Sequence, residues 1–245
     1  MTGATGVEMT IKVTDRTTVR FRYVATLMTA GTLAVVVSGC VFSGNSSELR
    51  GARRAIGALG PGFIDPAAPP PPEGTIRPRP GSWDGVRPPR GYRVVLLTAG
   101  TDPATTTVVR AVKRWARAEH VRLATIATTE PEAVEGIVQA MNLRPDLIIC
   151  AGNTLVDALA LVTASHLDRR FLVVGAQLPE PTVNVTAAIW RGAASVGGEV
   201  PDTVSSFDTN AFTPEHADAA IRAGVASVLN DFTGIVISLD LESSR

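Results

Sequence analysis

The stretch DLIICAGNTLVDAL, residues Asp146 to Leu159, combines a buried strand, a tight turn and the start of a helix. Its first part, Asp146 to Ala151, is a mostly apolar run, which is typical of a strand buried in a parallel sheet. The run ends at Gly152, and Asn153 is a residue type that caps helix amino termini. Apolar side chains at helical spacing then predict a helix from Thr154 to His166. A strand that leads directly into a helix is half of the βαβ unit from which parallel sheets are built.

The same alternation of strand and helix patterns continues on both sides of this stretch. Short connections and this alternation indicate a parallel sheet covered on both faces, and residues 91–245 suffice for one core but not two. The predicted fold class is therefore α/β, a single doubly wound, mostly parallel sheet. The other predicted strands are 93–98, 121–127, 171–175, 183–190 and 234–239, and the other predicted helices are 104–120, 130–142 and one that begins at Pro214 after Thr213.

The amino-terminal region has the features of a secretory leader. Arginines precede an apolar run of 15 residues, Tyr23 to Val37, whereas a membrane-spanning helix needs roughly 20. Val37 to Cys40 (VSGC) resembles the bacterial lipobox, at which the Cys thiol is acylated and the chain is cut just before it. We expect a lipoprotein signal peptide over residues 1–39, starting at Met1 or Met9, and lipidation such as palmitate at Cys40. The alternatives are an uncleaved anchor and a buried cysteine.

A proline-rich segment follows Cys40. Ten prolines lie between residues 61 and 89, and proline disfavours both helix and central strand because it lacks the N–H and fixes φ. The composition predicts a tether over residues 40–90 and a folded domain over residues 91–245. After the leader, no second apolar stretch approaches the length needed to span a membrane. We expect the protein to lie on the extracytoplasmic face of the cell membrane, where the lipid on Cys40 holds it.

Charge is divided unevenly along the chain, which limits the classes of partner. Residues 1–90 carry a net charge of +5 and residues 91–245 a net charge of −5. Basic residues near a lipid anchor suit an anionic membrane surface, whereas an acidic domain without a basic helix argues against nucleic acid. If Cys40 is acylated, Cys150 has no partner for a disulfide within the chain, and its apolar surroundings favour a buried packing role.

Candidate ligand-binding residues follow from the predicted topology. Ligands of open parallel sheets bind beyond the carboxyl ends of the strands, where the strand order reverses. The polar residues expected there are hydroxyl, carboxylate and amide side chains, which suit a small polar solute. The alternative is that Thr101, Asp102 and Asn153 only cap helices and shape turns. The predicted ligand-binding residues are Thr101, Asp102, Asn153, Asp157 and Gln177, with Asp157 in a supporting position.

Motifs for catalysis, cofactors and metals are not found in the sequence. There is no G-x-G-x-x-G after a strand, no Walker loop and no G-x-S-x-G elbow. The three histidines match no zinc spacing. We therefore expect no catalytic residue, no metal site, no cofactor and no enzymatic activity.

The order of the segments resembles the amino-terminal lobe of the BMP (basic membrane protein) family, which comprises solute-binding lipoproteins of ABC importers for nucleosides. The resemblance runs from Tyr92 to about Ser195. It depends on DLIICAGNTLVDAL (146–159), on FLVVGAQLPEPTVNVTAAIWR (171–191) and on the lipobox leader. It implies one lobe of a periplasmic-binding-protein-like fold, an ABC permease as partner and a nucleoside or similar solute as ligand. The resemblance is incomplete, because the family has two lobes whereas residues 91–245 predict one, and Thr101 to Thr107 contains no aromatic residue.

The functional prediction is a membrane-anchored extracytoplasmic lipoprotein that binds a small polar solute for an ABC importer. An alternative is a single-lobe lipoprotein that has lost solute binding and acts as a protein-interaction module, with self-association possible. A third hypothesis is a small α/β enzyme that uses Asp102 or Asp157 in the same crevice. Stabilisation by solutes distinguishes the first from the second, and loss of an activity on substitution of these carboxylates tests the third.

Overall fold

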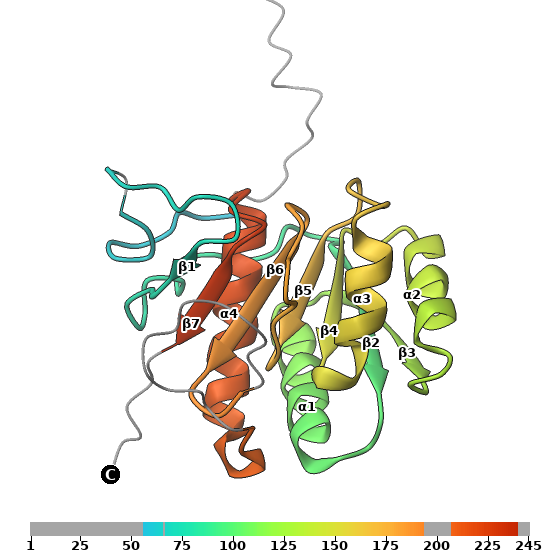
Figure 1. Cartoon of the computed structure of the whole chain (residues 1–245). Helices are drawn as coiled ribbons and strands as arrows, with labels where there is room; N and C mark the ends of the chain where they lie inside the picture. Colours follow the sequence, from blue (N-terminus) through green and yellow to red (C-terminus); the bar gives the residue numbers. More distant parts are fainter. Residues whose placement is uncertain (1–55, 66, 194–206, 240–245) are drawn as a thin grey trace, which may run out of the picture. The chain divides into compact units, whose positions relative to one another are not determined.

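The computed structural model describes residues 56–65, 67–193 and 207–239. These residues form one sheet of seven strands in the order β1-β7-β6-β5-β4-β2-β3 (Figure 1), and every neighbouring pair is parallel. The open parallel sheet confirms the predicted α/β class. The strands are β1 (Thr75–Ile76), β2 (Arg93–Ala99), β3 (Arg122–Thr128), β4 (Leu147–Ala151), β5 (Phe171–Val174), β6 (Val185–Trp190) and β7 (Val236–Leu239).

Helices lie on both faces of the sheet, as the doubly wound arrangement requires. Helices α1 and α4 contact each other over one face, and α2 and α3 contact each other over the opposite face (Figure 1). The helices are α1 (Pro103–Ala118), α2 (Ala133–Asn142), α3 (Val156–Thr163) and α4 (Pro214–Leu229), with 3₁₀ turns η1 (Asn153–Leu155) and η2 (Thr209–Ala211).

Side-chain alternation along the central strands divides the core into two layers. In β2, Val94 and Leu96 join the layer under α1 and α4, whereas Val95 and Leu97 join the layer under α2 and α3. All four side chains are almost fully buried. The continuous apolar run of β2 is explained by this burial on both faces, because successive strand residues point to opposite sides.

The domain begins upstream of the predicted boundary at residue 91. In the described part of residues 56–90, Phe63 and Trp83 are 2% and 5% exposed and belong to the core layer under α1 and α4. The strand β1 pairs with β7 at the sheet edge. Asp84 accepts a hydrogen bond of 2.7 Å from Arg222 in α4. Residues 56–65 and 67–90 are therefore part of the folded domain and not a tether.

Backbone hydrogen bonds explain how a proline-rich segment packs without regular structure. The chain around Gly60 runs beside the chain around Ser82, with the Gly60 N–H donating to the Ser82 carbonyl at 2.6 Å. Arg79 N–H donates to the Gly62 carbonyl, and Arg87 N–H donates to the Ile56 carbonyl. Proline excludes helix and central strand from this segment but leaves such an irregular, paired loop possible.

The predicted leader and the lipidation residue Cys40 lie outside the described residues. Within the parts of the chain that the structure describes, no helix has both the length and the apolar character needed to cross a membrane.

Candidate functional site

The loops that follow β2 and β4 diverge at the point where the strand order reverses. Strand β2 lies between β3 and β4 in the sheet. The loop after β2 leads to α1 on one face, whereas the loop after β4 leads through η1 to α3 on the opposite face. Adjacent loops that leave a sheet in opposite directions open a crevice between them, which is the usual ligand position in doubly wound folds.

A pocket of about 240 Å³ lies at this crevice. It is smaller than the roughly 300–1,000 Å³ of pockets that enclose a drug-sized ligand. The space therefore suits one ring-sized portion of a solute. The residues that line it come from the loop after β2 and the start of α1 (Asp102, Ala104, Thr105), from the loop after β4 (Gly152, Asn153, Thr154), and from the segment before α4 (Phe207, Thr209, Phe212).

Asp102 is the one charged residue among the described residues that line this pocket, and it also caps α1. Its Oδ1 accepts a hydrogen bond of 2.9 Å from the Thr105 N–H. Burial acts to raise the pKa of Asp102, but hydrogen bonds from the Thr105 side chain and from nearby backbone N–H groups outweigh it and lower the pKa. Asp102 is thus ionised at neutral pH. The predicted capping role is confirmed, and a carboxylate has further lone pairs for a ligand donor.

Asn153 is exposed at the crevice. Contrary to the prediction, its side chain does not cap a helix. It lies inside η1, whose first flanking residue is Gly152, and no side-chain capping hydrogen bond is formed at η1 or α3. The reason is the backbone at Gly152, which has φ 89° and ψ 178°, a conformation that glycine alone adopts readily. This turn brings the chain so close to α1 that a Cβ on Gly152 would lie 2.5 Å from Thr105 Oγ1.

An aromatic wall completes the pocket, and sequence reasoning missed it. Phe212 is buried against the Trp190 ring at 4.9 Å between centroids, and half-exposed Phe207 lies 5.4 Å from Phe212. The Ala211 carbonyl accepts a hydrogen bond of 2.8 Å from Trp190 Nε1. The sequence separation of more than 100 residues from Asp102 concealed this wall, although two phenylalanines just before a capped helix were a visible signal.

The other predicted ligand-binding residues are not among those that line the pocket. Thr101 is exposed beside Asp102, and its carbonyl accepts from Thr106 Oγ1 at 3.3 Å. Asp157 is exposed in the first turn of α3. Gln177 is 7% exposed and follows β5, two strands away from β2 in the sheet. The structure therefore brings together two of the five predicted residues, Asp102 and Asn153.

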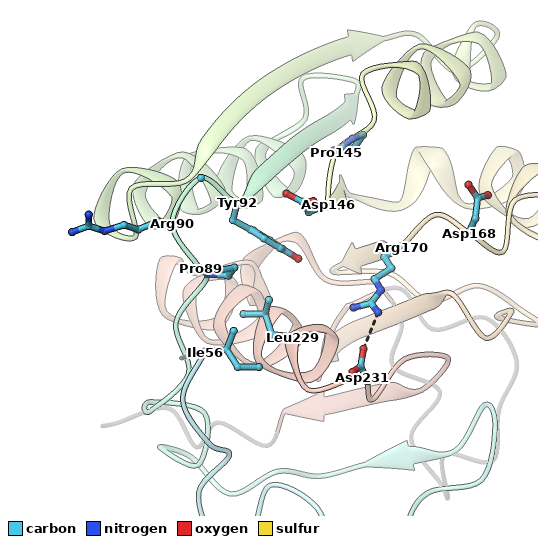
Figure 2. A pocket seen from close by; sticks show the side chains of 11 residues that line it. Ile56, Pro89, Arg90, Tyr92, Pro145, Asp146, Asp168, Arg170, Leu229 and Asp231 are labelled. Atoms are coloured by element: carbon cyan, nitrogen blue, oxygen red, sulfur yellow. Dashed lines mark hydrogen bonds and ion pairs between the residues drawn. The ribbon is translucent and has the colours of Figure 1, made fainter. Parts of the chain in front are cut away.

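A larger cavity of about 820 Å³ lies at the opposite end of the strands (Figure 2). The Tyr92 ring projects into it toward Arg170 (Figure 2), and burial together with the nearby Asp146 carboxylate raises the pKa of Tyr92. The lining residues are Ile56, Pro89, Arg90, Gly91, Tyr92, Pro145, Asp146, Asp168, Arg170, Leu229 and Asp231.

The charged groups of this cavity are largely paired with their neighbours. Arg170 donates to Asp231 Oδ1 at 2.8 Å and to the Val228 carbonyl at 3.1 Å. Asp146 Oδ2 accepts from the Arg93 N–H at 2.8 Å. Nowhere in the described residues are three His, Cys, Asp or Glu side chains grouped to hold a metal ion. Because parallel sheets bind ligands at the carboxyl ends of their strands, the smaller pocket is the better candidate site.

Cys150 lies in β4 and is completely buried. Burial raises the pKa of its thiol far above neutrality, so the reactive thiolate is not formed. Its burial in the core layer under α2 and α3 agrees with the packing role that the sequence favours.

Comparison with known proteins identifies no family for this chain. No family model matches it, and no curated protein matches it. Three solved structures match parts of the chain, each with a TM-score under 0.5. The fold assignment therefore comes from the sheet itself and not from these similarities.

Three solved structures illustrate the extent of the similarity. An ABC transporter solute-binding protein from Aeropyrum pernix K1 has 17% identity and TM-score 0.37, over 41% of this chain and 29% of its own. A solute-binding protein of an ABC transporter system from Conexibacter woesei DSM 14684 has 17% identity and TM-score 0.36, over 42% and 36%. A fragment of a presumed lipoprotein from Peptoclostridium difficile 630 has 14% identity and TM-score 0.41, over 58% and 99%. The chain thus spans about a third of the two solute-binding proteins.

Proposed function

We propose that this chain is a lipoprotein anchored through Cys40 on the extracytoplasmic face of a membrane, where its α/β domain binds a small polar solute for an ABC importer. The observation that supports solute binding is the pocket between the loops after β2 and β4, which combines polar groups with an aromatic wall. The lipobox-like sequence supports the anchor and the location. We propose no reaction, because Asp102 is the one titratable side chain in the described lining of the pocket, and that lining contains no base or activated nucleophile beside it.

The charge of the pocket selects among solutes. Asp102 already places a negative charge at the amino end of α1, which is the position that would otherwise attract an anion. Among the described residues that line the pocket, none is lysine or arginine. Asp102 would therefore repel an added phosphate or carboxylate, and no cation in the described lining compensates for that repulsion. The proposed solute is neutral or cationic.

The side chains of the pocket also indicate the shape of the solute. Phe207 and Phe212 offer apolar ring surface, which suits the flat face of a nucleobase or the apolar face of a sugar. Asp102 accepts hydrogen bonds, and Asn153, Thr105 and Thr154 both donate and accept them. A ring that bears hydroxyl or amino groups, as in a nucleoside or a monosaccharide, fits this combination.

Thermal unfolding of the purified full chain in the presence of solutes tests this proposal. A neutral nucleoside or monosaccharide that binds should raise the unfolding temperature, and at a hundredfold excess over its dissociation constant it should add about 2.7 kcal/mol of stability. The matching nucleoside monophosphate should give no shift. No stabilisation by any nucleoside, monosaccharide or cationic solute at millimolar concentration would refute the proposal.

Two substitutions locate the effect. Asp102→Asn keeps a good capping residue on α1 but removes the charge from the pocket, so it should abolish the ligand-induced shift with little loss of basal stability. Thr101→Ala changes an exposed neighbour that does not line the pocket and serves as the matched control. Equal shifts for both variants would place the ligand elsewhere.

A further inference from the structure

One edge of the sheet is β3, a strand of seven residues that has no strand beside it on its outer side in the described part of the chain. Strand β3 pairs with β2 through a one-to-one register over all seven residues, so it contains no bulge. Its outer side has no strand partner among the described residues. Between Leu123 and Thr128 the sequence LATIAT has neither charge nor proline, and Ala124, Thr125 and Ala127 are exposed. An open, uncharged edge strand is a template for pairing with another strand.

The opposite edge of the same sheet is protected in the usual ways. Strand β1 is two residues long, and prolines occur within a few residues on both sides of it. Short edge strands and nearby prolines are devices by which proteins prevent edge-to-edge association. Strand β3 is seven residues long and contains no proline, and this contrast indicates that its edge pairs with a strand of another chain.

The hydrogen-bonding groups on the free side of β3 can be assigned from the ladder. The Arg122 N–H donates to the Tyr92 carbonyl at 2.9 Å, so Arg122 faces β2. In an extended strand the N–H and C=O of successive residues point alternately to the two sides. The N–H and C=O groups of Leu123, Thr125 and Ala127 therefore point away from β2.

A second copy of this strand satisfies all of these groups in one register. Antiparallel pairing about a two-fold axis at Thr125 places Thr125 opposite Thr125 of the second copy, and Leu123 opposite Ala127. Each of these is a hydrogen-bonded pair, so every outward N–H and C=O gains a partner. Any other symmetric register leaves at least one of the three residues unpaired. Threonine pairs and apolar pairs across strands are stabilising, and no like charges face each other.

The charges around β3 are complementary under the same symmetry. Arg122 begins the strand, and Arg144 follows α2 at the same end of the sheet, where Asp146 N–H bonds to the Arg93 carbonyl. Glu130 and Glu132 lie just beyond the opposite end of β3. All four side chains are exposed, and none has an ion-pair partner within the described ranges. A two-fold axis at Thr125 brings the basic end of one copy to the acidic end of the other.

We infer that β3 is the interface through which two copies of this chain associate, forming one sheet that continues antiparallel across a two-fold axis at Thr125. A closed two-fold contact of this kind uses the same surface on both copies and leaves no second open edge at the junction. The solute pocket lies on the neighbouring strands β2 and β4, so this inference does not depend on solute binding.

Cysteine cross-linking of the full chain in membranes tests the register. The α-carbons of a hydrogen-bonded antiparallel pair lie about 5.5 Å apart, which is within the range that a disulfide spans. Thr125→Cys should therefore give mainly disulfide-linked dimer under mild oxidation. Ala160→Cys places a thiol on the exposed surface of α3, away from β3, and is the control. The native cysteines are common to both variants.

Charge exchange provides a second test that does not require oxidation. In the detergent-purified full chain, Arg122→Glu should weaken self-association by about tenfold, because the symmetry applies each change twice. Adding Glu130→Arg to Arg122→Glu should restore it. The inference is overturned if light scattering of the detergent-purified chain finds only monomer. It is also overturned if Thr125→Cys gives no more disulfide-linked dimer in membranes than Ala160→Cys. A dimer that is neither linked through Thr125→Cys nor weakened by Arg122→Glu would use another surface, and it would overturn the inference equally.

Discussion

Replacing Gly152 by alanine should be among the most costly small changes in the domain. The residue has φ 89° and ψ 178°, and a Cβ there would meet Thr105 Oγ1 at 2.5 Å. The backbone conformation alone costs a non-glycine residue about 1–3 kcal/mol. Overpacking against the buried Thr105 adds roughly 1–3 kcal/mol. We expect Gly152→Ala to lower the free energy of unfolding by about 3 kcal/mol or more.

Urea unfolding followed by tryptophan fluorescence measures this loss, since Trp83, Trp115 and Trp190 are all buried. Gly91 supplies a matched control, because it also has positive φ, at 79°, but a Cβ there would meet nothing within 4 Å. Gly91→Ala should therefore show the backbone cost without the overpacking. If Gly152→Ala costs no more than Gly91→Ala, the close approach between the loop after β4 and α1 is refuted.

A double-mutant cycle separates the two causes further. Thr105→Ala removes the hydroxyl that a Cβ at Gly152 would strike. In the Thr105→Ala background, Gly152→Ala should cost about 1–2 kcal/mol less than it does in the wild type, because the backbone strain remains while the clash is gone. Strictly additive effects would show that the two residues do not touch.

Three further outcomes follow from the structure. Trp83→Ala should lower the free energy of unfolding by about 3–5 kcal/mol, because Trp83 is a core residue; a loss below 1 kcal/mol in urea unfolding would mean that residues 56–90 are a tether after all. Phe207→Ala should weaken solute binding in calorimetric titration while costing little stability, since the side chain is half-exposed at the pocket; unchanged affinity would remove it from the site. Hydrogen bonds hold the pKa of Asp102 in the folded state below its value in the unfolded chain. Its contribution to stability is therefore fully present above the unfolded-state pKa and is lost as pH falls through the lower, folded-state pKa. The stability difference between wild type and Asp102→Asn should therefore be constant from pH 5 to 8 and should shrink only in acid; a change near neutrality would contradict the assignment.

The sequence predicts the regular elements of the domain well, because the burial of a strand or helix determines which neighbouring positions carry apolar residues. Strands such as β2 and β4 are continuous apolar runs between the two core layers, and the capped start of α4 at Thr213-Pro214 appears in the structure as the sequence suggests, with Thr213 Oγ1 accepting from the His216 N–H at 3.2 Å. These features need only neighbouring residues to be recognised.

The folded segment before residue 91 was missed for a physical reason. Proline content reports which regular structures a segment cannot form, but it does not report whether the segment packs. The buried Phe63 and Trp83 supply the apolar surface that attaches this segment to the core. Isolated aromatic residues without periodicity give no secondary-structure signal. The contacts that hold the segment in place, the pairing of β1 with β7 and the hydrogen bond of Asp84 with Arg222, involve residues far along the chain.

The candidate site was predicted in part, and the same distinction between local and distant contacts explains why. Asp102 and Asn153 follow directly from strand ends, so their place at the crevice is implied by topology. The aromatic wall comes from a segment that is distant in sequence and is placed by the hydrogen bond of Trp190 to the Ala211 carbonyl. Asn153 illustrates the opposite difficulty, because a good capping residue type was displaced from the cap by the turn at Gly152.

Hydrogen–deuterium exchange of the full chain, with and without a stabilising solute, reports where the solute binds. We expect slower exchange in the segments that follow β2 and β4, around Asp102 and Asn153, and no change around Tyr92 in the larger cavity. Protection confined to the residues around Tyr92 and Arg170, with none near Asp102, would contradict the assignment of the solute site to the carboxyl ends of the strands.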